Sequence, residues 1–238
     1  MIEIGMVPFT YGDQGQVYSV DEPFSMLREP SFPISGEVTK INNITNDMVS
    51  GKSIDPNEVF KFAQQAGLII AHNASFDRIF LEKYAPRFSE KAWACFMSQI
   101  AWKEEGFDGN RLSHIAAGFG FFYDAHRAVE DCWAGIEVLS RALPVSGELG
   151  LSKLLSAARK DTQRVWAVSA PFDLKDVLKA RGYRWNDGND GRPKAWYIDV
   201  VFEAYDEECR FLETEIYQRK INLLVTKITA KERFSTRV

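Results

Sequence analysis

The chain has 238 residues, of which 45% are hydrophobic and 26% charged, enough for one large domain or for an ordinary domain with a small one. These proportions exclude global disorder, and no apolar run approaches the roughly 20 residues of a spanning helix, so no membrane association is expected. The net charge of −4 predicts no long-range attraction to phosphate backbones. Three cysteines without a Cys-x-x-Cys pair argue against a disulfide framework or a zinc ribbon, and together with the lack of a secretory pattern after Met1 they predict a cytoplasmic protein.

The first third of the chain predicts a hairpin followed by helices. Residues 2–10 and the segment from Gln16 have the composition of two paired strands, and a short helical turn capped by Thr45 or Asn46 follows. An N-cap, an N1 proline and a capping-box acid, Asp55, Pro56 and Glu58, predict a helix over 56–66 that ends at Gly67.

The middle of the chain predicts a mixed α/β arrangement. LIIAHN from Leu68 is a continuous apolar run, typical of a strand buried on both faces, and FDRIFLEKY predicts a helix directly after it. Residues 92–103 and 112–121 predict two further helices, and an apolar stripe predicts a helix from His126 to Leu143. The expected fold class is α/β, with a mixed sheet and helices on both of its faces.

A second, smaller domain is expected after a hinge at 144–150, where Pro, Ser and Gly accumulate. The elements that follow predict the order β-α-β-β-α-β, a small α+β domain. The predicted boundaries are a first domain over 1–145, a linker or helix over 146–162 and an accessory domain over 163–238.

The first polar cluster lies where a buried strand meets the next helix, the position at which open α/β sheets place their ligands. It is the segment HNASFD, His72 to Asp77. The functional interpretation makes Asp77 a site residue. The alternative is that Asn73 and Ser75 merely cap the helix and Asp77 complements its dipole.

The second cluster is HRAVED, His126 to Asp131, at the start of the long predicted helix. Helical geometry places Asp131 about one and a half turns beyond His126, so the two side chains would flank one cavity without touching. Both could be ordinary solvated residues. However, Asp131 precedes the apolar pair Cys132 and Trp133, and a carboxylate at the edge of a buried face needs a partner such as Mg²⁺ or Mn²⁺.

Together the two clusters resemble the second and third motifs of the DEDDh 3′-5′ exonucleases, the family of the DNA polymerase III epsilon proofreading subunit, ribonuclease T and oligoribonuclease. The segments IEIGMV, NNITNDMVSG, CFMSQIAW and RLSHIAAGFGF agree with it, so the resemblance covers about residues 1 to 143. It implies a ribonuclease H-like mixed sheet and hydrolysis of phosphodiester bonds at single-stranded or frayed 3′ ends of DNA or RNA.

The resemblance also implies two-metal catalysis with Mg²⁺ or Mn²⁺. By that resemblance Asp131 binds a metal directly, Asp77 helps to hold the second, and His126 is the general base, a role open to a neutral imidazole. His72, Asn73 and Phe76 would line the pocket for the terminal nucleotide. Phe76 also fits the apolar stripe of its helix and could instead be a core residue.

The family's first motif, an Asp-x-Glu on the central strand of its sheet, does not occur before IEIGMV in these residues, and Glu3 is not its replacement. A late start codon, a fragment or a degenerate exonuclease with a rebuilt sheet would each explain this. Two carboxylates cannot hold two dications well, so we expect little or no metal-dependent hydrolysis from these 238 residues. A homodimer that pairs exposed strand edges would fit such a sheet.

The second domain weakly resembles a small domain of some bacterial DNA-metabolism proteins, through VSAPFDLKDVLKARGYRWN and KAWYIDV. Basic and aromatic side chains alternate there, as in proteins that grip single-stranded nucleic acid. The candidate contact residues are Lys175, Lys179, Arg184, Trp185, Lys194 and Trp196. The alternative is a solvated helix face with its tryptophans in a core.

The sequence therefore predicts a DEDDh-type 3′-5′ exonuclease with an accessory domain, acting near a DNA polymerase or a repair partner. The competing hypothesis is a non-catalytic protein that binds nucleic acid or another protein on the same fold. A purely structural protein would require both motif matches to be coincidental.

Overall fold

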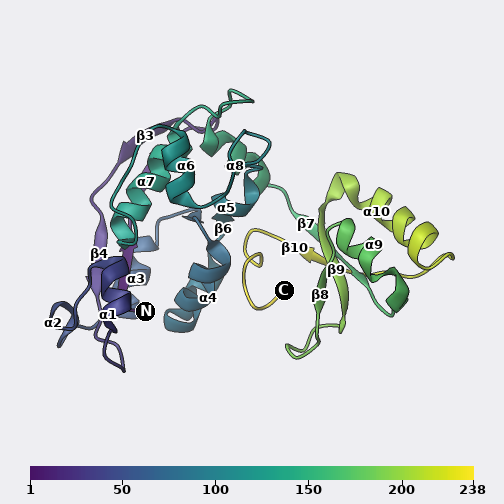
Figure 1. The fold of residues 1–238 in the computed structure, drawn as a ribbon, viewed down its shortest axis with the longest axis horizontal. Coiled ribbons are helices and arrows are strands. Elements are labelled where there is room, and N and C mark those ends of the chain that lie inside the picture. Colours follow the sequence, from purple (N-terminus) through teal and green to yellow (C-terminus); the bar gives the residue numbers. More distant parts are fainter. The chain divides into compact units, whose positions relative to one another are not determined.

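The structure is a computed structural model that describes residues 1–238, and the chain divides into two compact units, Met1–Ala158 and Arg159–Val238. Figure 1 draws the first unit in purple to teal and the second in green to yellow. Each unit combines helices with small sheets, which confirms the α/β class. None of the helices has both the length and the hydrophobicity needed to cross a lipid bilayer.

The first unit holds six strands and eight α-helices, with a 3₁₀ turn at Pro86–Glu90. The strands are β1 Glu3–Met6, β2 Phe9–Tyr11, β3 Val17–Val20, β4 Phe24–Leu27, β5 Ile69–Ala71 and β6 Trp93–Cys95. The helices are α1 Gly36–Asn42, α2 Asn46–Val49, α3 Pro56–Ala63, α4 Ala74–Tyr84, α5 Phe96–Gln99, α6 Leu112–Gly118, α7 Ala128–Ser140 and α8 Gly150–Ala158.

The strands of the first unit form three two-stranded ladders instead of one continuous sheet. The expected hairpin is present in two parts, since β1 pairs with β4 and β2 pairs with β3, both antiparallel. The third ladder joins β5 and β6 in parallel, with Ile70 opposite Ala94. Each of β1 and β5 therefore has a partner strand on one side only.

Several local predictions are confirmed at helix ends. Thr45 caps α2, since its hydroxyl accepts a hydrogen bond from the Met48 amide. The Asp55 carboxylate caps α3 through the Asn57 amide at 2.8 Å, and Pro56 occupies the first turn. The stop was predicted wrongly, because α3 ends at Ala63 with a right-handed C-cap and not at Gly67.

Residues 92–103 were wrongly predicted as one helix. They begin with the fully buried strand β6 and continue into only one turn of helix, α5. The reason is tertiary: Trp93, Ala94 and Cys95 pair with β5, and a buried parallel pairing outweighs the helical preference of a short apolar run.

The strand and helix that follow Leu68 are present, but their burial differs from the prediction. β5 is only half-buried, because it has a neighbouring strand on one side alone. On α4 the apolar stripe is exposed, with Phe76 58%, Ile79 41% and Phe80 47% accessible. The buried residues of α4 are Ala74 and Arg78, and Arg78 pairs with Glu82.

The core of the first unit lies between β6 and the helices α5 to α8. The expected hinge at 144–150 is a turn held inside this unit, since the buried Glu105 carboxylate accepts hydrogen bonds from the Val145 and Ser146 amides. α8, within the segment expected as a linker or helix, packs Leu151, Leu154 and Leu155 into the same core.

The second unit has the predicted order β-α-β-β-α-β. Its elements are β7 Thr162–Ala167, a 3₁₀ turn Phe172–Leu174, α9 Lys175–Ala180, β8 Arg184–Asn186, β9 Ala195–Val201, a 3₁₀ turn Phe202–Ala204, α10 Tyr205–Phe211, a π-helical turn Leu212–Ile216 and β10 Leu224–Ile228. The four strands form an antiparallel sheet in the order β10-β7-β9-β8. Gly182 stops α9 as expected, at φ +99°.

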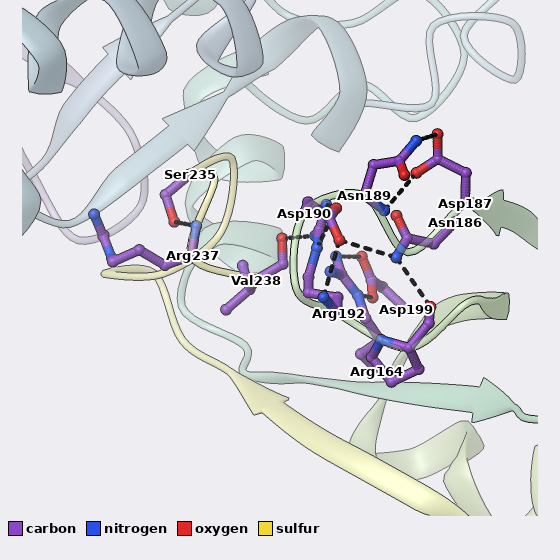
Figure 2. A network of polar contacts seen from close by, with 11 residues as sticks. Arg164, Asn186, Asp187, Asn189, Asp190, Arg192, Asp199, Ser235, Arg237 and Val238 are labelled. Atoms are coloured by element: carbon purple, nitrogen blue, oxygen red, sulfur yellow. Dashed lines mark hydrogen bonds and ion pairs between the residues drawn. The ribbon is translucent and has the colours of Figure 1, made fainter.

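Polar contacts fix one face of this sheet and its β8–β9 turn (Figure 2). Arg164 forms a two-bond pair with Asp199, Nε to Oδ1 at 2.6 Å and Nη2 to Oδ2 at 2.9 Å, and Arg184 shares the same carboxylate. In the turn, the buried Asn186 amide donates to Asp190 and to the Pro193 carbonyl oxygen. These bonds hold the glycine-rich turn in one conformation.

Candidate active site

Asp77 lies in the first turn of α4, directly after β5. The strand end is fixed because the His72 carbonyl oxygen accepts hydrogen bonds from the Met97 amide at 3.1 Å and from the Cys95 thiol. Asn73 is the N-cap, but its side chain makes no capping hydrogen bond. The purely structural interpretation of Asn73 therefore loses its main support, whereas Asp77 still complements the helix dipole.

Asp131 lies in the first turn of α7, which begins at Ala128, two residues later than predicted. His126 precedes the helix and has φ +74°, a left-handed conformation that a non-glycine residue adopts only when its surroundings impose it. Its backbone N–H donates to Asp131 Oδ1 at 3.3 Å. The sequence analysis considered only the two side chains, and the contact that the structure shows is made by the His126 backbone and not by the imidazole.

Two further groups that the sequence did not single out interact electrostatically with Asp131. Burial and then the negative charge of Asp131 raise the pKa of Tyr123. Cys132 points to the edge of β1, where its thiol contacts the Gly5 carbonyl oxygen at 3.7 Å. A tyrosine in an irregular segment and a cysteine in an apolar stripe carry no local sequence signal for such a role.

The start of α7 is held by hydrogen bonds to Glu3, the first residue of β1. One carboxylate oxygen accepts from Arg127 Nε and Nη2 at 3.0 and 2.9 Å, and the other accepts from the Ala128 amide at 3.0 Å. Glu3 thus occupies the position of a helix-capping acid although it lies on β1. Both oxygens of the Glu3 carboxylate are therefore engaged at the start of α7.

The charge of Asp131 influences the ionisation of Asp77. Partial desolvation of the Asp77 carboxylate raises its pKa to about 6, and the negative charge of Asp131 adds to the rise. Burial also raises the pKa of Asp131, and Tyr123 and the hydrogen bond from the His126 backbone oppose this rise. The thiol of Cys132 has its pKa raised to about 12 by burial and by both carboxylates. The site therefore concentrates negative charge from α4 and α7.

The two carboxylates suit one hard divalent cation, because oxygen ligands are what Mg²⁺ and Mn²⁺ prefer and a cation would relieve their repulsion. No group of three or more His, Cys, Asp or Glu side chains is arranged to hold a metal ion. Asp77 and Asp131 are therefore the two carboxylates that this site offers to a cation.

The residues predicted to line a nucleotide pocket lie around the start of α4. The His72 ring packs on Phe96 with centroids 4.8 Å apart, and its buried Nδ1 has no hydrogen-bond partner. Burial lowers the pKa of His72 to about 4, so the ring is neutral at pH 7. Phe76 is no core residue, because it is exposed; its ring packs on Phe80, with centroids 4.7 Å apart.

The candidate contact residues of the second unit differ in how far they are exposed and in whether they already have a partner. Trp196 packs against the core, where Trp185 meets it edge-on at 5.4 Å, and the Lys179 ammonium lies 5.9 Å from its ring. Trp185 is 50% exposed, and Lys194 is exposed. Lys175 lies over the exposed Phe172 at 4.2 Å, whereas Arg184 is engaged by Asp199.

Comparisons with known proteins place the sequence of this chain in a family. A sequence model of the Exonuclease family (RNase_T) matches residues 1–139. Relatives include the DNA polymerase III subunit epsilon of Treponema pallidum, 32% identical over 149 residues, which are 59% of this chain and 66% of that protein. The DNA polymerase III PolC-type of Listeria monocytogenes is 30% identical over 48% of this chain and 8% of its own length.

The subunit epsilon of Aquifex aeolicus is 26% identical over 52% of this chain and 65% of that protein. A solved structure titled Exonuclease X in complex with 5′ overhanging duplex DNA aligns with 64% of this chain and 99% of its own, at 22% identity and a TM-score of 0.41. The chain spans less than two thirds of the length of the curated relatives described here. Because the family model covers more than half of its residues, the chain belongs to the Exonuclease (RNase_T) family.

Proposed function

We propose that the protein is a 3′-5′ exonuclease that hydrolyses phosphodiester bonds at the 3′ ends of single-stranded or frayed DNA or RNA. The observation that carries the proposal is the pairing of Asp77 and Asp131, 54 positions apart in the chain yet close enough for the charge of one to raise the pKa of the other. Membership of the exonuclease family supports assigning this pair to phosphodiester hydrolysis.

In this proposal the two carboxylates hold Mg²⁺ or Mn²⁺. When bound, such a cation stabilises the charge that develops on the phosphodiester oxygens and acidifies a bound water. The exposed His126 imidazole accepts the proton of the attacking water. The left-handed backbone conformation of His126, with φ +74°, sets the direction of its Cα–Cβ bond. His72, Asn73 and Phe76 contact the terminal nucleotide, with the neutral His72 ring and exposed Phe76 offering surfaces for base or sugar.

The same proposal predicts that these 238 residues hydrolyse slowly, because two carboxylates supply ligands for one dication and the reaction uses two. A non-catalytic nucleic-acid-binding protein on this fold is the competing function. Its support is the second unit, where Lys175, Lys179 and Lys194 accompany the exposed Trp185 and the edge of Trp196.

The deciding experiment incubates a 5′-labelled single strand with the chain and millimolar Mn²⁺ for hours, and quantifies released nucleoside monophosphates by mass spectrometry. His126→Ala and Asp131→Asn test the site, and His114→Ala, which changes an exposed histidine outside it, is the matched control. Release by the wild type and by His114→Ala, lost in both site variants, supports the exonuclease. Equal release from all four proteins, with strand binding retained, would favour the binding protein.

Partners follow from the same proposal. Relatives named as DNA polymerase III subunits and as PolC-type polymerases support an association with a DNA polymerase or a repair assembly, and the cysteine content supports a cytoplasmic setting.

We also propose a homodimer through β5. The residues of this strand are Ile69, Ile70 and Ala71, and none of them carries the charge that usually protects an edge strand from pairing. Sedimentation equilibrium of the wild type against Ile70→Lys tests it: a dimer lost in the variant supports the proposal, and a monomeric wild type contradicts it.

A further inference from the structure

A groove of about 420 Å³ opens on the surface of the first unit, where β4 meets the segment after α2 and the start of α7. Its lining combines hydroxyl, apolar and basic side chains and contains no acid. The lining residues are Ser25, Met26, Leu27, Lys52, Ser53 and Arg127. Because Arg127 directly follows His126 in the chain, the groove begins beside the candidate active site.

The segment that carries Lys52 is held in place by Glu29. The Lys52 carbonyl oxygen accepts the Glu29 amide at 2.9 Å, and the Glu29 carboxylate accepts the Gly51 amide at 2.8 Å. Gly51 has φ +67°, a left-handed conformation that glycine adopts without strain. The backbone of Lys52 is therefore fixed, whereas its side chain is exposed and forms no ion pair with a carboxylate of the protein.

Arg127 supplies the second cation of the groove. Its Nε and Nη2 both donate to one oxygen of Glu3, which fixes the plane of the guanidinium. These bonds do not use Nη1, and 31% of the side chain is exposed. A guanidinium held on one side and open on the other is a pre-oriented donor for a phosphate oxygen. Since Glu3 balances the charge of Arg127, the excess positive charge of the groove comes from Lys52.

The chemistry of this lining matches the backbone of a nucleic acid. Lysine, arginine and serine side chains are among the groups that contact phosphate oxygens in protein complexes with nucleic acids. The half-buried Met26 and Leu27 add apolar surface for a sugar or base. Because the chain as a whole carries a net charge of −4, attraction to a phosphate has to come from such a local group of cations.

We propose that this groove binds a backbone phosphate of the strand whose 3′ end lies at Asp77 and Asp131, with Lys52 as the main contact. The inference rests on the proposed function and deepens it, because it makes an oligonucleotide, and not a derivative of a single nucleotide, the class of substrate. Lys52 and Arg127 hold the strand and take no part in the hydrolysis.

The test measures binding of a short fluorescein-labelled single strand to the full chain by fluorescence anisotropy, over a series of salt concentrations without divalent metal. Lys52→Gln removes the charge, and Lys52→Arg keeps it. Lys103→Gln is the matched control, because it removes the charge of an exposed lysine of the same unit that does not line the groove. Any contribution of the second unit is common to all four proteins, so the differences report the first unit.

We expect Lys52→Gln to bind the strand about two- to fivefold more weakly than the wild type at low salt, the range of an exposed ion pair. The slope of log affinity against log salt should become shallower by about 0.7, the value for one phosphate contact of a single strand. Lys52→Arg and Lys103→Gln should match the wild type in both measurements.

Equal slopes in Lys52→Gln and Lys103→Gln would overturn the inference, and so would a wild type that binds no strand. The release of nucleotides with Mn²⁺, measured on the same proteins, reports the proposed function separately. A wild type that releases nucleotides while Lys52→Gln binds as the control does would thus contradict the groove and leave the exonuclease intact.

Discussion

The ionisation of His72 makes the acid stability of the first unit calculable. Burial lowers its pKa from 6.5 to about 4, so between these values the unfolded chain binds a proton that the folded chain does not. Stability is therefore lost as the pH falls through this window, and the loss ends near the folded pKa. Since one pKa unit corresponds to about 1.4 kcal/mol, the full loss is about 3 kcal/mol, and about 2 kcal/mol of it falls between pH 7 and pH 5.

The perturbation is His72→Phe, which keeps an aromatic ring against Phe96 and removes both the titrating nitrogen and the unpartnered Nδ1. Urea unfolding is measured at pH 7 and pH 5 for wild type, His72→Phe and, as a control, His114→Asn at an exposed histidine. All other titrating groups are shared, so the change in the pH 7 to pH 5 difference isolates His72. The variant should lose about 2 kcal/mol less than the wild type, and equal losses in the two proteins would refute the reasoning.

Three further predictions concern contacts described above. Glu3→Gln should destabilise the first unit by about 2 kcal/mol in urea unfolding, because a neutral amide no longer balances the arginine at the start of α7; a change below about 0.5 kcal/mol would contradict this. Asp199→Asn should cost about 3 kcal/mol, because it leaves the Arg164 guanidinium, with a side chain 8% exposed, without its counter-charge, and the melting curve of the second unit measures it. Iodoacetamide at pH 8 should modify Cys209 about tenfold faster than Cys132, whose thiol pKa is raised to about 12, as followed by peptide mass spectrometry; equal rates would be inconsistent with that burial.

Local signals predicted the parts of the fold that depend on neighbours in sequence. The cap at Asp55, the proline after it and the glycine at 182 each act within a few residues, and the structure has all three. The strand and helix order of the second unit followed for the same reason, because its turns are marked by glycine and proline.

The wrong predictions of secondary structure and burial have a different cause: they concern features that depend on residues far away in the sequence. Residues 93–95 form a strand only because β5 lies beside them, and no pattern within the segment reveals this. The apolar side of α4 was expected to be buried, and the structure exposes it while burying Arg78 beside Glu82. Burial is a property of the assembled unit, so periodicity alone could not supply it.

The same distinction between local and distant partners applies to the candidate site. The two motif segments and their carboxylates were found from the sequence, and the structure brings Asp77 and Asp131 within electrostatic reach. The contact of Asp131 with the His126 backbone was not found, because it depends on where α7 begins. The sequence therefore predicted which groups are present, and the three-dimensional arrangement supplied what holds them.

The bond between Glu3 and Arg127 joins residues 124 positions apart, which has a consequence for the order of events during folding. Closing a loop of that length costs about 4 kcal/mol of chain entropy, so this contact forms only after nearer contacts have shortened the effective loop. The start of α7 thus acquires its final geometry late. A partly synthesised or partly folded chain would contain both aspartates without the final geometry at the start of α7, so the candidate site would be complete only at the end of folding.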